Sequence, residues 1–221
     1  HKTYNVDTNT STFYNKYDTT MQDTDTGIKH IISVIPDLKS LGIHIDLCIN
    51  PVDCLFNYLP NTITSLDLSG IINFNDTHIN IISHKCPLLK KLQLKYADMT
   101  DNGLKYLTLC SSLENCYLYG CTHITDVGLE YISTIGSIRK ITLDWCNLIT
   151  DSGINTLVKS NPNLTHISLQ CTTIGEPSVN SMLKYLNYPS YINMNYCYRI
   201  NILNLSRLRK KCKLVLNNKI N

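Results

Sequence analysis

A twelve-residue pattern occurs twice in succession in this chain. Residues 118–129 read Leu-Tyr-Gly-Cys-Thr-His-Ile-Thr-Asp-Val-Gly-Leu, and residues 143–154 read Leu-Asp-Trp-Cys-Asn-Leu-Ile-Thr-Asp-Ser-Gly-Ile. The two copies start 25 positions apart (143 minus 118). A fixed period of about 20 to 29 residues predicts a solenoid in which each unit contributes one strand and one helix.

The same period extends over most of the chain as an apolar-x-apolar strand core. Its members are Leu66 and Leu68, Leu92 and Leu94, Cys116 and Leu118, Ile141 and Leu143, Ile167 and Leu169, and Ile192 and Met194. The second members follow at steps of 26, 24, 25, 26 and 25 residues, and another apolar residue comes ten or eleven positions after each. We expect six α/β units with their strands in one parallel sheet. A seventh, degraded unit is expected upstream, because residues 35–43 echo residues 86–94.

Length and composition exclude several classes of protein. The 221 residues are 43% hydrophobic, which is enough to bury a continuous apolar core in a single solenoid domain. A net charge of +3 is too mild to require a nucleic-acid or membrane partner. No apolar run approaches the length of a membrane span, and residues 1–27 contain no hydrophobic signal-peptide core. We therefore expect a soluble protein of the cytoplasm or nucleus.

The ten cysteines of the chain largely follow the repeat. Cys121, Cys146 and Cys197 lie three residues after the strand core, while Cys86 and Cys110 lie on the helix side before the next strand. Equivalent positions stack along a solenoid in apolar surroundings, where free cysteine behaves as a small hydrophobe. We expect reduced structural thiols rather than disulfides, which indicates a reducing compartment.

The two ends of the chain differ from the repeats. Residues 1–27 are rich in Thr, Asn, Asp and Tyr without apolar periodicity, so we expect a disordered tail there and a repeat domain over residues 28–221. Apolar residues at helical spacing from Ile28 to Ile35 predict a covering helix that ends at Pro36. Residues 205–212 predict a last basic helix, and residues 214–216 a terminal strand. The cationic face of that helix is compatible with a nuclear-localisation or nucleic-acid signal, although the interleaved Leu205 and Leu208 favour a solvated helix face.

The units resemble the cysteine-containing leucine-rich repeats of F-box and leucine-rich-repeat proteins over residues 36–216. The resemblance implies a right-handed horseshoe with a parallel sheet on the concave face. It also implies binding of a protein substrate for a cullin-type ubiquitin ligase of the SCF class. An F-box is not recognisable in residues 1–35, so a freestanding scaffold or decoy is the alternative, and a cullin-ligase adaptor is expected only if an F-box lies upstream. The abundant Asn, Ile, Lys and Tyr also resemble the composition of proteins encoded by giant DNA viruses.

No catalytic, metal-binding or cofactor-binding motif emerges from the sequence. There is no Cys-x2-Cys pair for zinc and no glycine-rich phosphate loop. Asp126 and Asp151 are explained by the repeat as turn and cap residues, with Thr150 as an alternative helix cap. We expect a protein that is not an enzyme and that carries no cofactor.

The outward positions of the strands give the candidate site. They form one row of Gln93, Tyr117, Thr142 and Ser168, and a second row of Lys95, Tyr119, Asp144 and Gln170. We predict a protein-binding centre on the second, third and fourth units made of Tyr96, Tyr117, Tyr119, Asp144 and Trp145, with Lys91, Lys95 and Lys140 as its polar rim. Tyrosines that merely tolerate strand positions, and lysines that are merely solvated rather than recruiting an acidic segment, are the alternatives.

Overall fold

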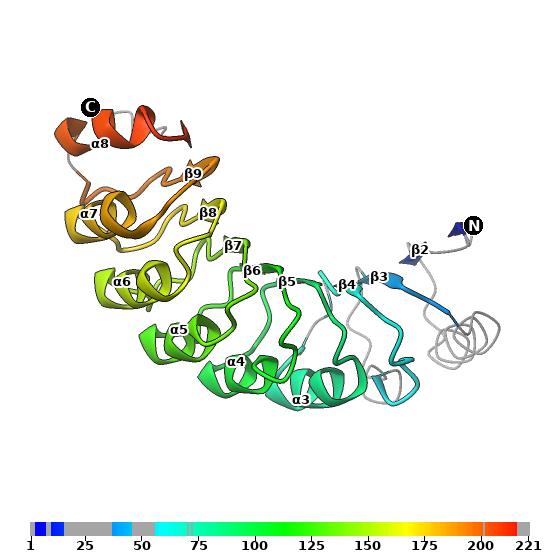
Figure 1. The fold of residues 1–221 in the computed structure, drawn as a ribbon. Coiled ribbons are helices and arrows are strands. Elements are labelled where there is room, and N and C mark those ends of the chain that lie inside the picture. Colours follow the sequence, from blue (N-terminus) through cyan, green and yellow to red (C-terminus); the bar gives the residue numbers. More distant parts are fainter. Residues whose placement is uncertain are drawn as a thin grey trace.

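The structure is a computed structural model in which successive units stack into an arc. It describes the backbone of residues 3–7, 10–15, 37–45, 56–69, 71, 73–200 and 202–215. Each unit consists of a strand, a turn, a helix and a return loop, and the strands line the inner side of the arc while the helices cover its outer side (Figure 1). This arrangement confirms the solenoid expected from the repeat.

The described strands form a single sheet whose spatial order follows the sequence. They are β1 Thr3–Asp7, β2 Thr10–Asn15, β3 Ser40–Ile45, β4 Ser65–Asp67, β5 Lys91–Lys95, β6 Asn115–Tyr119, β7 Lys140–Thr142, β8 His166–Ser168, β9 Tyr191–Asn193 and β10 Lys213–Val215. The helices are α3 Asp76–Lys85, α4 Asp101–Leu107, α5 Asp126–Ser133, α6 Asp151–Ser160, α7 Glu176–Tyr185 and α8 Ile202–Arg209. Every neighbouring pair of strands from β2 to β10 is parallel, and β1 pairs with β2 antiparallel.

The strand register is the one that the repeat predicts. Leu66 pairs with Leu92, Leu92 with Cys116, and the series continues through the first core members of β7, β8 and β9. Leu41 of β3 pairs with Leu66, so the degraded upstream unit is confirmed at its strand. The predicted terminal strand is also confirmed, because Leu214 of β10 pairs with Ile192 of β9.

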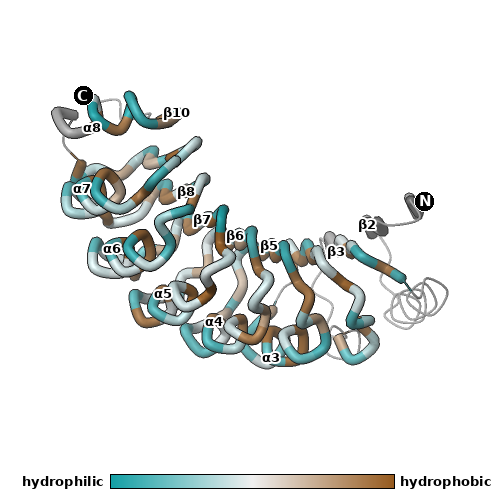
Figure 2. Tube along the Cα trace, viewed as in Figure 1, coloured by the Kyte–Doolittle hydropathy of each residue, from teal (hydrophilic) through white to brown (hydrophobic). Residues whose placement is uncertain are grey.

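The core lies between the sheet and the helices and runs without a break along the arc. Its side chains include both core members of every strand from β4 to β9, all of them buried. Figure 2 shows the apolar stretches alternating with hydrophilic ones along the turns of the solenoid. A core that grows along one axis makes each unit depend on its neighbours for burial.

The cysteines after the strand cores belong to this core. The eight cysteines in the described part of the chain are free thiols. The thiol of Cys146 donates to the carbonyl of Leu118 at 3.2 Å, and that of Cys197 to the carbonyl of Leu169 at 3.0 Å. Burial raises the pKa of the Cys121 thiol to about 12. Each of these thiols is therefore a protonated packing group that links its unit to the unit before it.

Adjacent units are also clamped at the helix N-termini. Thr150 caps α6, because its side chain accepts the N–H of Ser152. The backbone N–H and the hydroxyl of Thr150 both donate to the carboxylate of Asp126, the first residue of the preceding helix. The same arrangement joins Asp76 to Thr100 and Asp101 to Thr125. The Thr150 cap is thus confirmed. The aspartates at the first position of these helices also bind the next unit, so they stabilise the contact between units as well as their own turn.

The N-terminal region differs from the sequence-based expectation. The structure places β1 and β2 inside residues 1–27, where the composition predicts a disordered tail. Pairing of β2 with β3 satisfies the backbone groups that β3 would otherwise leave exposed at the sheet edge. The boundary between residues 27 and 28 stays a prediction. The helix expected over residues 28–35 and the segment 46–55 lie outside the described residues.

The predicted C-terminal helix is present as α8, Ile202–Arg209. In α8, Leu205 and Leu208 are buried against the last unit, while Arg207 and Arg209 are exposed. The cationic residues therefore lie on the face of α8 that points away from the core.

Candidate partner-binding surface

The predicted rows of outward side chains are present on the concave face. Gln93 pairs with Tyr117, which in turn pairs with Thr142. In the row toward the amino ends of the strands, Asn115 lies between Lys91 and Lys140. The register thus brings residues from units two, three and four onto one surface.

Each unit from the second to the sixth leaves the sheet through a residue in the left-handed backbone region. The φ angle is 53° at Tyr96, 68° at Gly120, 64° at Trp145, 56° at Cys171 and 60° at Tyr196. The N–H groups of Tyr96 and Trp145 donate to backbone carbonyls of the next unit, at 2.8 and 2.9 Å, and these bonds hold the conformation. A bulky residue in this region costs about 1 to 2 kcal/mol relative to glycine. The aromatic residues at these positions therefore carry a backbone cost that glycine would avoid.

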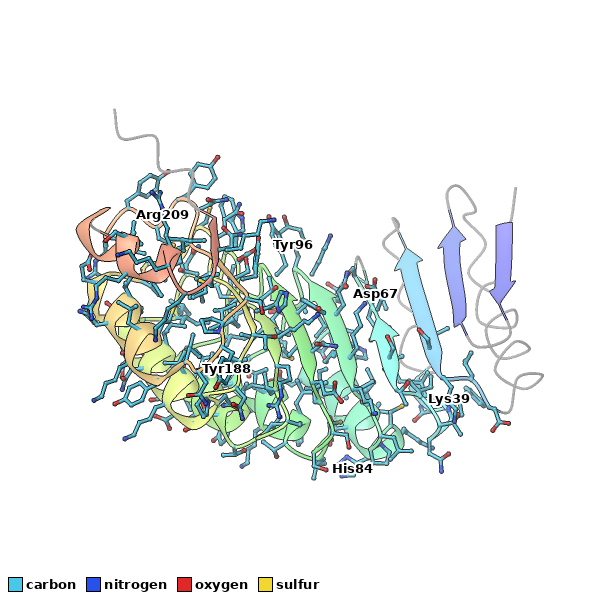
Figure 3. All side chains as sticks on the ribbon, turned by 45° about the horizontal axis from the view of Figure 1, so that its top comes forward. Lys39, Asp67, His84, Tyr96, Tyr188 and Arg209 are labelled. Atoms are coloured by element: carbon cyan, nitrogen blue, oxygen red, sulfur yellow. The ribbon has the colours of Figure 1, made fainter. Side chains whose placement is uncertain are left out.

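Tyr96 is the most exposed aromatic member of the predicted site and packs on its neighbours. In Figure 3 it lies beyond the tips of the strand arrows, on the side opposite to His84. Its side chain is 70% exposed, and its ring meets the ring of Tyr119 edge-on with centroids 5.3 Å apart. A methyl group at Gly120 would lie 2.5 Å from Cδ1 of Tyr96, so the ring rests on the backbone of this glycine. A hydrogen bond with Tyr96 raises the pKa of Tyr119.

Trp145 occupies the equivalent position two units away from Tyr96. It is 44% exposed, so it does not belong to the core. Tyr196 follows at the same position near the C-terminal end, where it is also exposed. The sequence-based site omits Tyr196, although the repeat spacing alone places it in line with Tyr96 and Trp145.

The sequence analysis places Asp144 on the accessible surface, but in the structure its side chain is buried. Its side chain is 8% exposed. Its Oδ1 accepts the hydroxyl of Ser168 at 2.6 Å and the N–H of Gln170 at 2.7 Å. Burial raises the pKa of the Asp144 carboxyl. The short side chain turns toward the next strand, so Asp144 joins β7 to β8 and is withdrawn from direct contact with a partner.

The three lysines of the predicted rim remain on the surface. The ammonium of Lys91 lies 5.8 Å from the centroid of the Tyr117 ring, within cation–π range. Lys95 is exposed and Lys140 is half-buried. Within the described residues a salt bridge joins His123 to Asp98, whereas these lysines form none.

His166, next to Lys140 in its row, gives a spectroscopic test of this surface. Burial, and then the charge of Lys140, lower its pKa below 6.5. We expect an NMR pH titration to show His166 losing its proton below pH 6.5, so that it is neutral at pH 7. Lys140→Gln should raise the His166 pKa part of the way back, because it removes the charge and leaves the burial. Lys159→Gln, on the outer helix α6, is the control, and an equal shift in both variants would contradict the placement of Lys140 beside His166.

The described residues give no sign of metal or membrane chemistry. No group of three or more His, Cys, Asp or Glu side chains in this part of the chain is arranged to hold a metal ion. None of its helices is both long and apolar enough to cross a bilayer. What the surface offers is aromatic rings, ammonium groups and hydrogen-bonding side chains on a rigid sheet, which are the components of a binding surface.

Comparisons with known proteins agree with the fold. A family model described as Leucine Rich repeat matches residues 85–107. No curated protein matches the chain by sequence. Solved structures do match by shape, and they include a chain of the Rad7 and Elc1 complex from yeast, with a TM-score of 0.57 and 14% identity over 86% of this chain and 64% of that one.

Two further structures extend this likeness. TLR13, from its complex with ssRNA13, has a TM-score of 0.59 and 20% identity over 84% of this chain and 26% of its own. An internalin from Listeria monocytogenes has a TM-score of 0.59 and 15% identity over 85% of this chain and 57% of its own. The chain thus spans less than two thirds of each of these three proteins. The fold is a leucine-rich-repeat solenoid, as its periodicity predicts.

Proposed function

We propose that this solenoid is a non-catalytic protein-interaction module whose partner lies on the concave face over β5, β6 and β7. The observation that carries the proposal is the placement of Tyr96 and Trp145 at left-handed backbone positions, where glycine would cost less. Both side chains are exposed, Tyr96 packs on Tyr119, and aromatic residues dominate the energetics of protein interfaces. A stability role does not account for this arrangement.

Within this class, we propose substrate recognition for an SCF-type ubiquitin ligase. The support is the sequence resemblance of the cysteine-containing units to F-box and leucine-rich-repeat proteins. A freestanding scaffold or decoy, which occupies a partner without delivering ubiquitin, is the competing function. The neighbouring structures include a protein complex and an RNA complex, and at 14% and 20% identity they support the fold alone. The free thiols of the described residues support a reducing compartment, the cytoplasm or nucleus.

Site-directed photo-crosslinking would test the concave assignment. A photo-reactive phenylalanine at Tyr119 should capture the partner in a reducing lysate of the cells that express the protein. The same group at Glu130, which is exposed on α5 of the same unit, is the control and should capture it poorly. Recovery of a cullin and its adaptor with the full-length protein supports ligase assembly, whereas a partner recovered without them supports the scaffold. Capture from Glu130 alone would move the site to the convex helices.

Trp145→Gly should separate binding from stability. We expect it to weaken binding of the purified partner by about 2 kcal/mol, or about 30-fold in Kd, because it removes an exposed aromatic anchor. Its free energy of unfolding should stay unchanged or rise slightly, since glycine relieves the left-handed backbone at this position. Titration calorimetry and urea unfolding provide the two measurements. Lys159→Ala on α6 is the control, and wild-type affinity in Trp145→Gly would show the concave assignment to be wrong.

A further inference from the structure

Three lysines surround the tyrosines of the concave face in a fixed geometry. Lys91 and Lys140 are two strands apart at matched register positions, so their Cα atoms are about 10 Å apart. Lys95 is four residues beyond Lys91 on β5, which places it about 13 Å along the strand. Tyr117 and Tyr119 of β6 lie between these positions. We call these five residues the lysine–tyrosine surface.

The three ammonium groups of this surface form no salt bridge within the described part of the chain. Two carboxylates lie in the rows of this face, and that of Asp144 is buried and accepts two hydrogen bonds from β8 and its following turn. Asp67 of β4 accepts the N–H of Ser69. No described carboxylate forms a salt bridge with Lys91, Lys95 or Lys140. Three ammonium groups on a rigid sheet, none of them in a salt bridge with a described residue, attract an anionic partner.

We propose that the partner presents an acidic, extended segment that crosses β5, β6 and β7 on the lysine–tyrosine surface. This inference rests on the proposed function and specifies the chemistry of its partner. Residues three positions apart in an extended chain are separated by about 10 Å, which matches Lys91 and Lys140. Two carboxylates at this spacing bind the two ammonium groups, and an apolar side chain between them lies over Asn115 and contacts the ring of Tyr117.

The arrangement of the rings favours an acidic peptide over single-stranded nucleic acid. Binding of a strand without sequence preference needs cations that track the phosphates and aromatic faces that are free to stack bases. Here the row through Lys91 and Lys140 alternates with the neutral Asn115. The ring of Tyr117 already faces the ammonium of Lys91, and Tyr119 is engaged edge-on by Tyr96. A few ion pairs and an apolar contact are what this surface can supply.

Selection from a displayed library of short random peptides tests the proposal. We expect wild-type protein to enrich peptides with Asp or Glu three positions apart and an apolar residue between them. Lys91→Glu combined with Lys140→Glu should weaken the selected peptide by at least about tenfold, as measured by fluorescence anisotropy. Lys105→Glu combined with Lys159→Glu makes the same change of net charge on exposed positions of α4 and α6, and it should leave the affinity unchanged. Replacing the peptide's acids by their amides should reproduce the loss.

Other outcomes distinguish this inference from the proposed function. The selected peptides could instead be neutral or basic, and lose binding with Trp145→Gly but not with the lysine reversals. That result would overturn the proposal of an acidic segment and would still support a protein-binding site on the concave face. Peptides that are indifferent to both sets of variants would overturn both. A labelled oligouridylate that binds more tightly than the peptides at physiological salt, and is released by the Lys91 and Lys140 reversals, would replace the acidic peptide by nucleic acid. Sedimentation of the unliganded protein excludes a second copy as the occupant if it remains a monomer.

Discussion

We expect Leu143→Ala to lower the free energy of unfolding by about 3 kcal/mol, within the range of about 2 to 5 kcal/mol for buried leucines. Leu143 is fully buried and is the second core residue of the fourth unit, in line with Leu118 and Leu169. Removal of the Leu143 side chain leaves a cavity in the core. At each point along the arc this core is formed by a single unit. Urea unfolding followed by circular dichroism would measure the loss.

The matched control is Thr142→Ala. Thr142 is adjacent in the chain, but its side chain points to the concave surface and is half-buried. We expect its truncation to change the free energy of unfolding by no more than about 0.5 kcal/mol. A loss below that value for Leu143→Ala, or equal losses in both variants, would contradict the register of the sheet. Hydrogen exchange would show the destabilisation spreading first to α5 and α6, because a solenoid couples nearest neighbours.

The fold of the repeats could be predicted because one period repeats with little variation. A register is set by the apolar pair in each strand, and an error of one residue would turn every core side chain outward. Leu41 is an example, because the similarity of residues 35–43 to residues 86–94 predicts its pairing with Leu66 correctly. Before Leu38 the period is lost. The strands β1 and β2 extend the sheet through backbone hydrogen bonds, for which the polar sequence of that region carries no side-chain signal.

The sequence predicts which residues of the candidate site line up in rows across the strands. It does not predict how exposed each side chain is. Alternation along a strand places Tyr117, Tyr119 and Asp144 on the same face, and the register confirms their order. It does not reveal that a short carboxylate beside Ser168 is satisfied within the chain, which withdraws Asp144 from the surface. Nor does it reveal the left-handed backbone of Trp145, since this conformation is fixed by a hydrogen bond to the next unit. Contacts between units are the part of the structure that pattern analysis of a single unit misses.

The clamp between units leads to the second large prediction. We expect Gly153→Ala to lower the free energy of unfolding by about 2 kcal/mol, although alanine stabilises an ordinary helix by about 1 kcal/mol over glycine. A methyl group at Gly153 would lie 2.3 Å from Oδ1 of Asp126. The carboxylate would have to move away from Thr150, whose N–H and hydroxyl both donate to it. Thr150 is exposed, so water replaces part of these hydrogen bonds, and the main cost is the overpacking of the methyl group against Asp126 and Leu129, typically about 1 to 3 kcal/mol.

Gly136→Ala provides the contrasting substitution, because nothing lies within 4 Å of a methyl group at that position. We expect it to change stability by less than about 1 kcal/mol, and in the stabilising direction if its backbone accepts alanine. A double-mutant cycle identifies the cause of the Gly153 effect. In an Asp126→Ala background the methyl group meets no carboxylate, so Gly153→Ala should cost little, and the coupling energy should exceed about 1 kcal/mol. Additive losses would show that Asp126 and Gly153 act independently, and that the units are held together by the apolar core without the clamp.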